Sequence, residues 1–253
     1  MAYALRAYEY WMLTYRRVFR GTLASSILNP VLYLTALGVG LGTVVNKGAH
    51  PLGVPYLTYV APGLLAAVAM QVSTIEAAWP VHAAIRWTRQ YFAMLATPLR
   101  IVDLIAGHLL YVATRAAMSG AIYLVVIAAF GAVRSAWALL AWPACVLIGL
   151  AFAAPVSALS AYAEREPFNP LMRFGIMPMF LFSGTFFPVT QLPHGLRELA
   201  YATPLWHGVD LIRHFTLGTP TLGEAVGHVA YLLLWVGAGV WLARLAYRKR
   251  LVL

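Results

Sequence analysis

The sequence predicts an all-α integral membrane protein with six transmembrane helices, forming a single domain over residues 1–253. Three observations support this prediction. The chain is 62% hydrophobic and only 10% charged, whereas a soluble domain is about 45–50% apolar and about 25% charged. Five apolar runs approach or exceed the length of about 20 residues that a bilayer crossing needs. A sixth run, Ile176 to Phe187, is shorter and is interrupted by Pro178 and Gly184.

The first twenty residues are predicted to form an amphipathic helix in the membrane interface. Apolar residues from Leu5 to Phe19 recur at spacings of three and one, a helical pattern, with four arginines among them. Aromatic residues on one face and arginines on another are typical of interfacial helices. A cytosolic helix packed on a partner is the alternative.

The expected spans follow in order. The first apolar run starts near Gly21 and lasts about 20 residues, longer than the apolar part of a signal peptide, so we expect a true first span, kinked at Asn29-Pro30. The second should continue as helix to Trp87. The spans are expected at about residues 22–42, 57–80, 105–130, 137–161, 174–188 and 226–243.

The basic residues predict the orientation, because cytoplasmic loops of membrane proteins are enriched in Lys and Arg. With both termini in the cytoplasm, only four of the 18 basic residues lie on the outer side, and Arg115 lies within the third span. Those four are Lys47, Arg134, Arg197 and Arg213. We therefore interpret the net charge of +10 as a topology signal rather than as a sign of nucleic-acid binding. We expect a multi-pass protein of the bacterial plasma membrane, in contact with its lipids.

Enzyme motifs are missing from the sequence. There is no GxSxG and no HExxH, and neither lysine, Lys47 or Lys249, lies in a P-loop pattern. The single cysteine, Cys145, lies in an apolar run and is read as a packing residue. No catalytic, cofactor-binding or metal-binding residue is predicted. His207, Asp210 and His214 share a helical face, but we expect this to be the wet face of an exterior amphipathic helix.

Two ionisable residues fall at membrane depth. In an antiparallel hairpin of spans two and three whose turn pairs Thr88 with Asp103, Glu76 and Arg115 are equally far from the turn. Charged groups at such depth face the protein interior or pair. We expect an inward-facing ion pair, with either a structural or a transport role.

The turn between those spans predicts a short amphipathic helix, Gln90 to Pro98, flanked by arginines. Such a helix at the tip of two long spans suits a groove on a soluble partner, and resting on lipid is the alternative. The residues in question are Gln90, Tyr91, Phe92, Met94, Leu95, Thr97 and Pro98. The broken fifth run provides a candidate transport path or exterior gate, although its aromatic residues equally suit helix packing. These residues are Phe182, Gly184, Phe186, Phe187 and Pro188.

With these features the chain resembles the ABC-2 type exporter permeases, especially the daunorubicin-resistance and nodulation-factor export branch. The resemblance rests on the amphipathic N-terminus, on MLATPLRIVDLIAGH at 94–108, and on LFSGTFFPVTQLP with ATPLWHGVDLIRHFTLG at 181–193 and 202–218. It covers nearly the whole chain.

The resemblance implies a dimer of permeases, homo- or heteromeric, with two copies of a separate P-loop subunit that binds ATP and Mg²⁺. It makes Gln90–Pro98 the cytoplasmic coupling helix and the stretch at about 189–217 exterior re-entrant helices. The expected function is export of a hydrophobic or amphipathic, drug- or lipid-like substrate. A polysaccharide or glycolipid exporter of the same fold is the alternative, as is a polytopic membrane enzyme or assembly factor with His207, Asp210 and His214 as its site.

Overall fold

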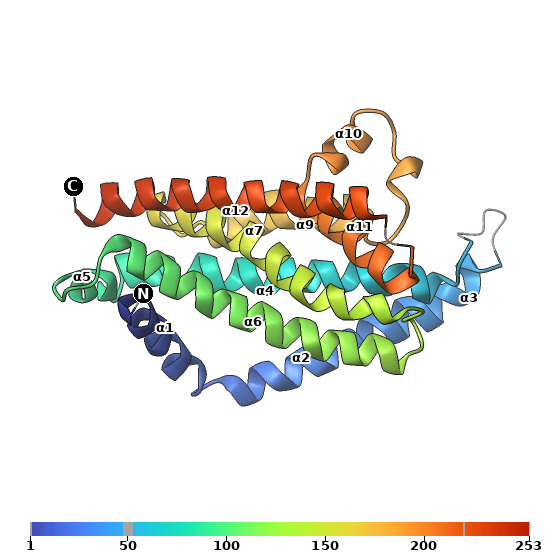
Figure 1. The fold of residues 1–253 in the computed structure, drawn as a ribbon, viewed down its shortest axis with the longest axis horizontal. Helices are drawn as coiled ribbons and strands as arrows, with labels where there is room; N and C mark the ends of the chain where they lie inside the picture. Colours follow the sequence, from blue (N-terminus) through green and yellow to red (C-terminus); the bar gives the residue numbers. More distant parts are fainter. Residues whose placement is uncertain (1, 48–52, 220, 253) are drawn as a thin grey trace.

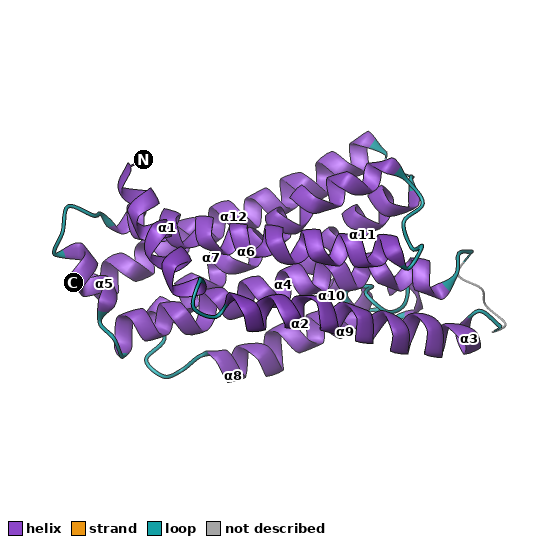
Figure 2. Ribbon diagram, turned by 90° about the horizontal axis from the view of Figure 1, so that it is seen from below, coloured by secondary structure: helices purple, strands orange, loops and turns teal. Residues whose placement is uncertain are grey.

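A computed structural model describes residues 2–47, 53–219 and 221–252, and every regular element within these ranges is a helix (Figure 2). The long helices run roughly along one axis and form an elongated bundle (Figure 1). Both ends of the chain lie at the same end of this bundle as the short helix α5 (Gln90–Leu95). The helix α3 (Gly42–Val45) lies at the opposite end.

Five of the expected spans are confirmed as helical stretches long and apolar enough to cross a membrane, among the described residues. The first comprises α2 (Phe19–Tyr33), a π-helical segment η1 (Leu34–Leu41) and α3. Pro30 lies inside α2 and precedes the π-helical segment by one turn, where a proline removes a helical hydrogen bond. The other four are α4 (Tyr56–Arg86), α6 (Ile101–Ala129), the 3₁₀ segment η2 (Ala136–Leu140) with α7 (Ala141–Tyr162), and α12 (Leu222–Leu251).

The expected fifth span differs from its predicted bounds, 174–188. Helix begins earlier, as α8 (Phe168–Leu171), η3 (Met172–Ile176, π-helical) and α9 (Met177–Phe182), and it ends at Phe182. At 1.5 Å per residue this stretch is about 22 Å long, short of the roughly 30 Å hydrocarbon core. The cause lies at Gly184, whose φ of +79° ends the helix in a conformation that favours glycine.

The chain after Phe182 forms a 3₁₀ turn η4 (Val189–Gln191), α10 (Leu196–Tyr201) and α11 (Pro204–Leu217). Figure 1 shows α10 standing off the side of the bundle. In contrast, α11 packs among α4, α7 and α12. Gly208 allows this approach, because a Cβ there would lie 2.6 Å from Cγ1 of Ile148 on α7.

The N-terminal helix α1 (Ala2–Tyr15) is a separate helix, as expected, but it packs on its own chain. A Cβ on Gly107 of α6 would lie 2.6 Å from the backbone oxygen of Ala4, so the absence of a side chain at Gly107 lets the two backbones approach closely. Trp11 and Tyr15 are buried in this contact, while Leu13 on the opposite side is 59% exposed. The apolar pattern of α1 therefore serves an intramolecular interface as well as an outer face.

Candidate functional site

A cavity of about 360 Å³ lies between α2, α4 and α6. Its lining is unusually polar for a region between membrane-spanning helices. Hydroxyl and amide groups come from α2 and α4, and one acidic and one basic side chain complete the wall. The lining residues are Thr22, Ser25, Ser26, Asn29, Pro30, Val68, Gln71, Val72, Ile75, Glu76 and Arg115.

The charged pair in this wall consists of Glu76 from α4 and Arg115 from α6. Nε of Arg115 lies 2.9 Å from Oε1 of Glu76, so the structure brings together the two residues that the sequence places at equal depth. The Arg115 side chain is 4% exposed and that of Glu76 is 18% exposed. The pair is therefore largely removed from solvent, and Glu76 is the member more open to the cavity.

Aromatic and polar groups from α6 and α1 hold the pair in place. Tyr111 Oη donates a hydrogen bond of 2.9 Å to Oε2 of Glu76, which occupies the second carboxylate oxygen. The guanidinium carbon of Arg115 lies 4.2 Å from the ring centroid of Tyr15, within the range of a cation–π interaction. Trp11 stacks on Tyr111 with ring centroids 5.9 Å apart.

A line of contacts joins this pair to α5. The backbone oxygen of Glu76 lies 3.0 Å from Nε2 of His108, and Nδ1 of His108 lies 3.3 Å from the hydroxyl of Tyr91. Tyr91 is completely buried and also lies against Tyr247 of α12, with ring centroids 5.7 Å apart. Gln90 accepts a hydrogen bond of 2.8 Å from Tyr10 of α1. The short helix is thus anchored to α1, α6 and α12.

The residues of the predicted partner-docking helix fall on two faces. Helix ends at Leu95, and Thr97 and Pro98 lie in an exposed turn. Tyr91 is buried and Leu95 is partly buried against the helices behind it, whereas Phe92 is 40% exposed. Met94 is likewise partly buried against the same apolar cluster. Phe92 and the smaller Ala93 are therefore the exposed apolar side chains of this helix, and Phe92 offers the larger surface to a partner.

The residues predicted as a transport path or exterior gate do not line the cavity. Gly184 accepts a 2.7 Å hydrogen bond from Nη2 of Arg213 on α11, and the Arg213 guanidinium lies 4.0 Å from the ring centroid of Tyr59 on α4. A Cβ on Gly63 of α4 would lie 2.6 Å from the backbone oxygen of Thr185. The segment at Gly184 and Thr185 is therefore held against α4 and α11 by close backbone packing.

The aromatic residues of the same group are engaged in side-chain packing. Phe186 contacts Phe180 edge to face with centroids 4.9 Å apart. Phe187 packs on a small cluster with Val189 and Leu192. Phe182 is 38% exposed as the last residue of α9, and Pro188 precedes the turn η4.

His207, Asp210 and His214 share a face of α11 as expected, and this face is only partly exposed because it packs against α12. Asp210 Oδ2 lies 3.5 Å from Nε2 of His214 and 3.2 Å from Nε2 of His228 on α12. His207 and His228 approach with their Nδ1 atoms 2.8 Å apart. Although these side chains lie close together, no group of three His, Cys, Asp or Glu within the ranges that the structure covers is arranged so that it could hold a metal ion. The cluster joins α11 to α12.

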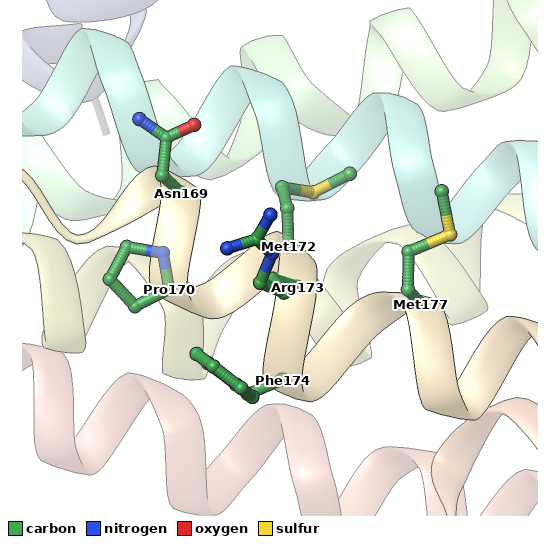
Figure 3. Close-up of a pocket in the computed structure, with 6 residues that line it drawn as sticks. All are labelled: Asn169, Pro170, Met172, Arg173, Phe174 and Met177. Carbon is green, nitrogen blue, oxygen red and sulfur yellow. The ribbon is translucent and has the colours of Figure 1, made fainter.

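A larger depression of about 590 Å³ lies along the stretch from α8 to α9. Figure 3 shows that all of its side chains project from this single stretch. They are Asn169, Pro170, Met172, Arg173, Phe174 and Met177. Because no second element supplies a group, this depression lacks the convergent polar contacts of the cavity at Glu76.

Sequence reasoning missed several members of the site. Tyr111 and His108 appear in the sequence as parts of an apolar run, and their hydrogen bonds depend on how α5 and α6 meet α4; Tyr91 was predicted as a partner-docking residue, but its inward contact with His108 was not. A signal was present for α2, where Ser25, Ser26 and Asn29 are polar residues within a membrane span. Polar residues at such depth mark functional surfaces by default.

Comparison with known proteins places the chain in a family. The family model described as ABC-2 type transporter matches residues 7–217. Nodulation protein J of Rhizobium meliloti is 32% identical over 241 residues, covering 95% of this chain and 90% of that protein. Nodulation protein J of Rhizobium leguminosarum bv. trifolii is 34% identical over 250 residues, covering 96% and 94%. The chain is therefore a multi-pass protein of the bacterial inner membrane, and it belongs to the ABC-2 type transporter family.

Proposed function

We propose that this chain is the membrane-spanning subunit of an ATP-driven exporter, and that a separate ATP-binding subunit acts on it through α5. The observation that carries this proposal is the line of contacts from Tyr91 through His108 to Glu76 and Arg115 at the cavity. α5 has only six residues, and its buried side chain is wedged between α1, α6 and α12. A force on α5 therefore displaces groups that border the cavity.

We place the end of the bundle that carries α5 and both termini in the cytoplasm. This orientation is supported by the arginines that flank α5 at that end, Arg86 and Arg89 before it and Arg100 after it, because cytoplasmic loops are enriched in basic residues. In this orientation the exposed ring of Phe92 faces the cytoplasmic partner. ATP and Mg²⁺ bind to that partner, since the chain carries no P-loop motif.

We further propose two copies of the permease, as a homo- or heterodimer, with two ATP-binding subunits. Support comes from the outer faces of α2 and α12, which expose large apolar side chains. Leu28 and Leu32 on α2 are 56% and 57% exposed, and Leu234 on α12 is 68% exposed. Such faces contact lipid tails or another apolar helix.

The segment after Phe182 is proposed to re-enter the membrane from the exterior. Gly208 of α11 lies against Ile148, two helical turns into α7, whereas Gly218 after α11 lies against Ser135 before η2. α11 thus runs from within the bundle back towards its outer end, as a re-entrant helix does. The hydrogen bond from Arg213 to Gly184 closes the loop that this path forms.

The proposed substrate is hydrophobic or amphipathic, of a drug- or lipid-like kind. A cavity with hydroxyl and amide groups between apolar helices suits a molecule with one polar end, because the polar lining offers hydrogen bonds that lipid does not. The same lining, together with the similarity to proteins named Nodulation protein J, favours a glycolipid or polysaccharide as the second candidate. The contact of Phe180 with Phe186 indicates packing rather than an aromatic channel.

The proposal is tested by purifying the tagged chain from its native membrane and reconstituting it with what co-purifies. We expect a stoichiometric P-loop ATPase whose activity is stimulated by the substrate, screened over drugs, lipids and glycolipids. Tyr91→Phe removes the hydroxyl facing His108 and should lower substrate stimulation while leaving complex formation intact. Tyr231→Phe, which removes a hydroxyl bound to the backbone of Ala202, is the matched control. Absence of an ATPase, with activity lost on changing His207, would instead support a membrane enzyme.

A further inference from the structure

The two helices α7 and α12 form a groove that the proposed transport path does not use. They approach closely at Gly239, where a Cβ would lie 2.5 Å from Cδ of Pro155. On the side of this crossing nearer the C-terminus, an elongated cavity of about 380 Å³ opens along both helices. Its lining residues are Pro155, Ala158, Leu159, Tyr162, Leu242, Leu245, Ala246 and Lys249.

Each helix supplies one stripe to this groove. The stripe of α7 begins at Pro155 and that of α12 at Leu242, and in both the later members follow at three, four and seven residues. This spacing places each stripe on a single helical face. Seven residues of helix span about 10 Å, and the walls are apolar until Tyr162 and Lys249. Leu242 and Leu245 are 45% and 49% exposed, so this chain leaves the groove uncovered.

The end of the groove is basic. A second cavity of about 170 Å³ adjoins it, sharing Tyr162, Ala246 and Lys249 and adding Glu164 and Arg250. Lys249 Nζ lies 5.1 Å from the ring centroid of Tyr162, which orients the ammonium over the groove. Nη2 of Arg250 is buried without a hydrogen-bond partner, and Oε1 of Glu164 lies 4.0 Å away, beyond hydrogen-bond length. Glu164 still pairs with Arg250 at this salt-bridge distance, but one carboxylate faces two cations, Lys249 and Arg250, so this end of the groove keeps a net positive charge.

We propose that this groove binds an anionic phospholipid, with an acyl chain along the stripes of α7 and α12 and the phosphate at Lys249 and Arg250. The groove is apolar along its length and ends in two cations within the last turn of α12. A phospholipid has the same sequence of groups, an apolar acyl chain followed by a charged phosphate. Basic pockets between transmembrane helices bind anionic head groups in this way. The site lies apart from the Glu76 cavity, which is formed by α2, α4 and α6.

A second copy of the chain fits the groove less well. A two-fold symmetric interface uses the same patch on both copies. An interface centred on this groove would bring Lys249 and Arg250 close to their own counterparts, and like charges placed together oppose association. A lipid phosphate, in contrast, supplies the missing negative charge.

The test is native mass spectrometry of the full-length protein, titrated with phosphatidylglycerol or with phosphatidylcholine of the same acyl chains. We expect selective retention of phosphatidylglycerol. Lys249→Gln with Arg250→Gln should weaken retention roughly 30-fold. Arg244→Gln with Arg248→Gln is the matched control, because it removes the same charge from exposed positions of α12 outside the groove and should leave retention unchanged. Leu245→Trp, which fills the apolar part, should weaken it without changing charge.

Four results would overturn the proposal. Equal retention of the two lipids would show that the cations play no part, and equal loss in the control pair would show only general surface charge. If inorganic phosphate bound saturably and displaced the lipid, the cations alone would account for binding and the apolar groove would not be needed to hold an acyl chain. Efficient disulfide cross-linking through Leu245→Cys in membranes would assign the groove to a second copy, since the native Cys145 is buried.

Discussion

Replacing Glu76 by Gln removes the negative charge from a pair whose arginine is almost wholly buried. The guanidinium of Arg115 then remains charged although its side chain is only 4% exposed. Its remaining electrostatic partner is the ring of Tyr15. Gln can still accept the hydrogen bond from Tyr111, so the substitution tests the charge rather than the shape. The neighbouring cavity lets water approach from one side.

The magnitude follows from the burial. Removing one partner of a buried ion pair costs about 3–5 kcal/mol, and water access from the cavity places this pair at the lower end, about 3 kcal/mol. A pair that was effectively solvent-exposed would contribute only about 0.2–1 kcal/mol. Glu9→Gln, which breaks the exposed pair with Arg6, is the matched control and should change stability by less than about 0.5 kcal/mol.

The assay is unfolding of the purified protein by SDS titration in mixed micelles, with Glu76→Gln, Arg115→Met and the double variant compared. Because the double variant buries no unpaired charge, it should cost less than the sum of the single changes. The charge swap Glu76→Arg with Arg115→Glu should recover part of the assembly lost in each single swap. A loss below about 1 kcal/mol for Glu76→Gln, or strict additivity in the double variant, would refute a buried, coupled pair.

Three further sets of substitutions test other parts of the molecule. Phe92→Asp should uncouple ATP hydrolysis from export without loss of membrane insertion, because the ring of Phe92 is exposed. Normal transport by this variant would exclude a coupling role. Leu95→Asp should in addition destabilise the protein, since Leu95 packs inward. Gly63→Ala places a Cβ 2.6 Å from the oxygen of Thr185 and should lower thermal stability more than Gly223→Ala, which meets nothing within 4 Å. Arg89 has a φ of +51°, so Arg89→Gly should raise stability by up to about 1 kcal/mol, measured by thermal unfolding, while Arg89→Val should lower it.

The long helices were predictable because the apolar residues that mark a membrane span are contiguous in the sequence. Apolar runs of sufficient length identify α4, α6, α7 and α12, and the predicted continuation of α4 to the surface is confirmed. The start of α6 was placed four residues late, although a cap signal was present. Asp103 accepts from the backbone nitrogen of Arg100 at 3.0 Å, and a capping carboxylate at this position is typical of a helix start.

The position of α11 was not predictable from its residues alone. Four ionisable side chains in fourteen residues are typical of a wet helix, and composition favours the exterior. In the structure Asp210 contacts His214 and His228, and Arg213 donates a hydrogen bond to the backbone of Gly184. A buried polar residue is inexpensive when partners from distant elements meet it, and no pattern within α11 reveals those partners.

The contacts at the cavity and at the predicted exterior gate also join elements that are distant in the sequence, so they could not be predicted either, except for the pair of Glu76 with Arg115. Helix α4 takes part in both sets of contacts. Tyr59 and Gly63 of α4 contact Arg213 and Thr185 near one end, and Glu76 of the same helix pairs with Arg115. Thirteen residues separate Gly63 from Glu76, about 20 Å along the axis. From Gly63 to Glu76 the helix contains no proline, so its backbone hydrogen bonds couple these two contacts along the axis. We infer that movement of α4 relative to α6 and α11 changes the cavity and the contacts at Gly184 and Thr185 together, so that a variant weakening the Glu76 pair should also alter the accessibility of a cysteine introduced at Thr185.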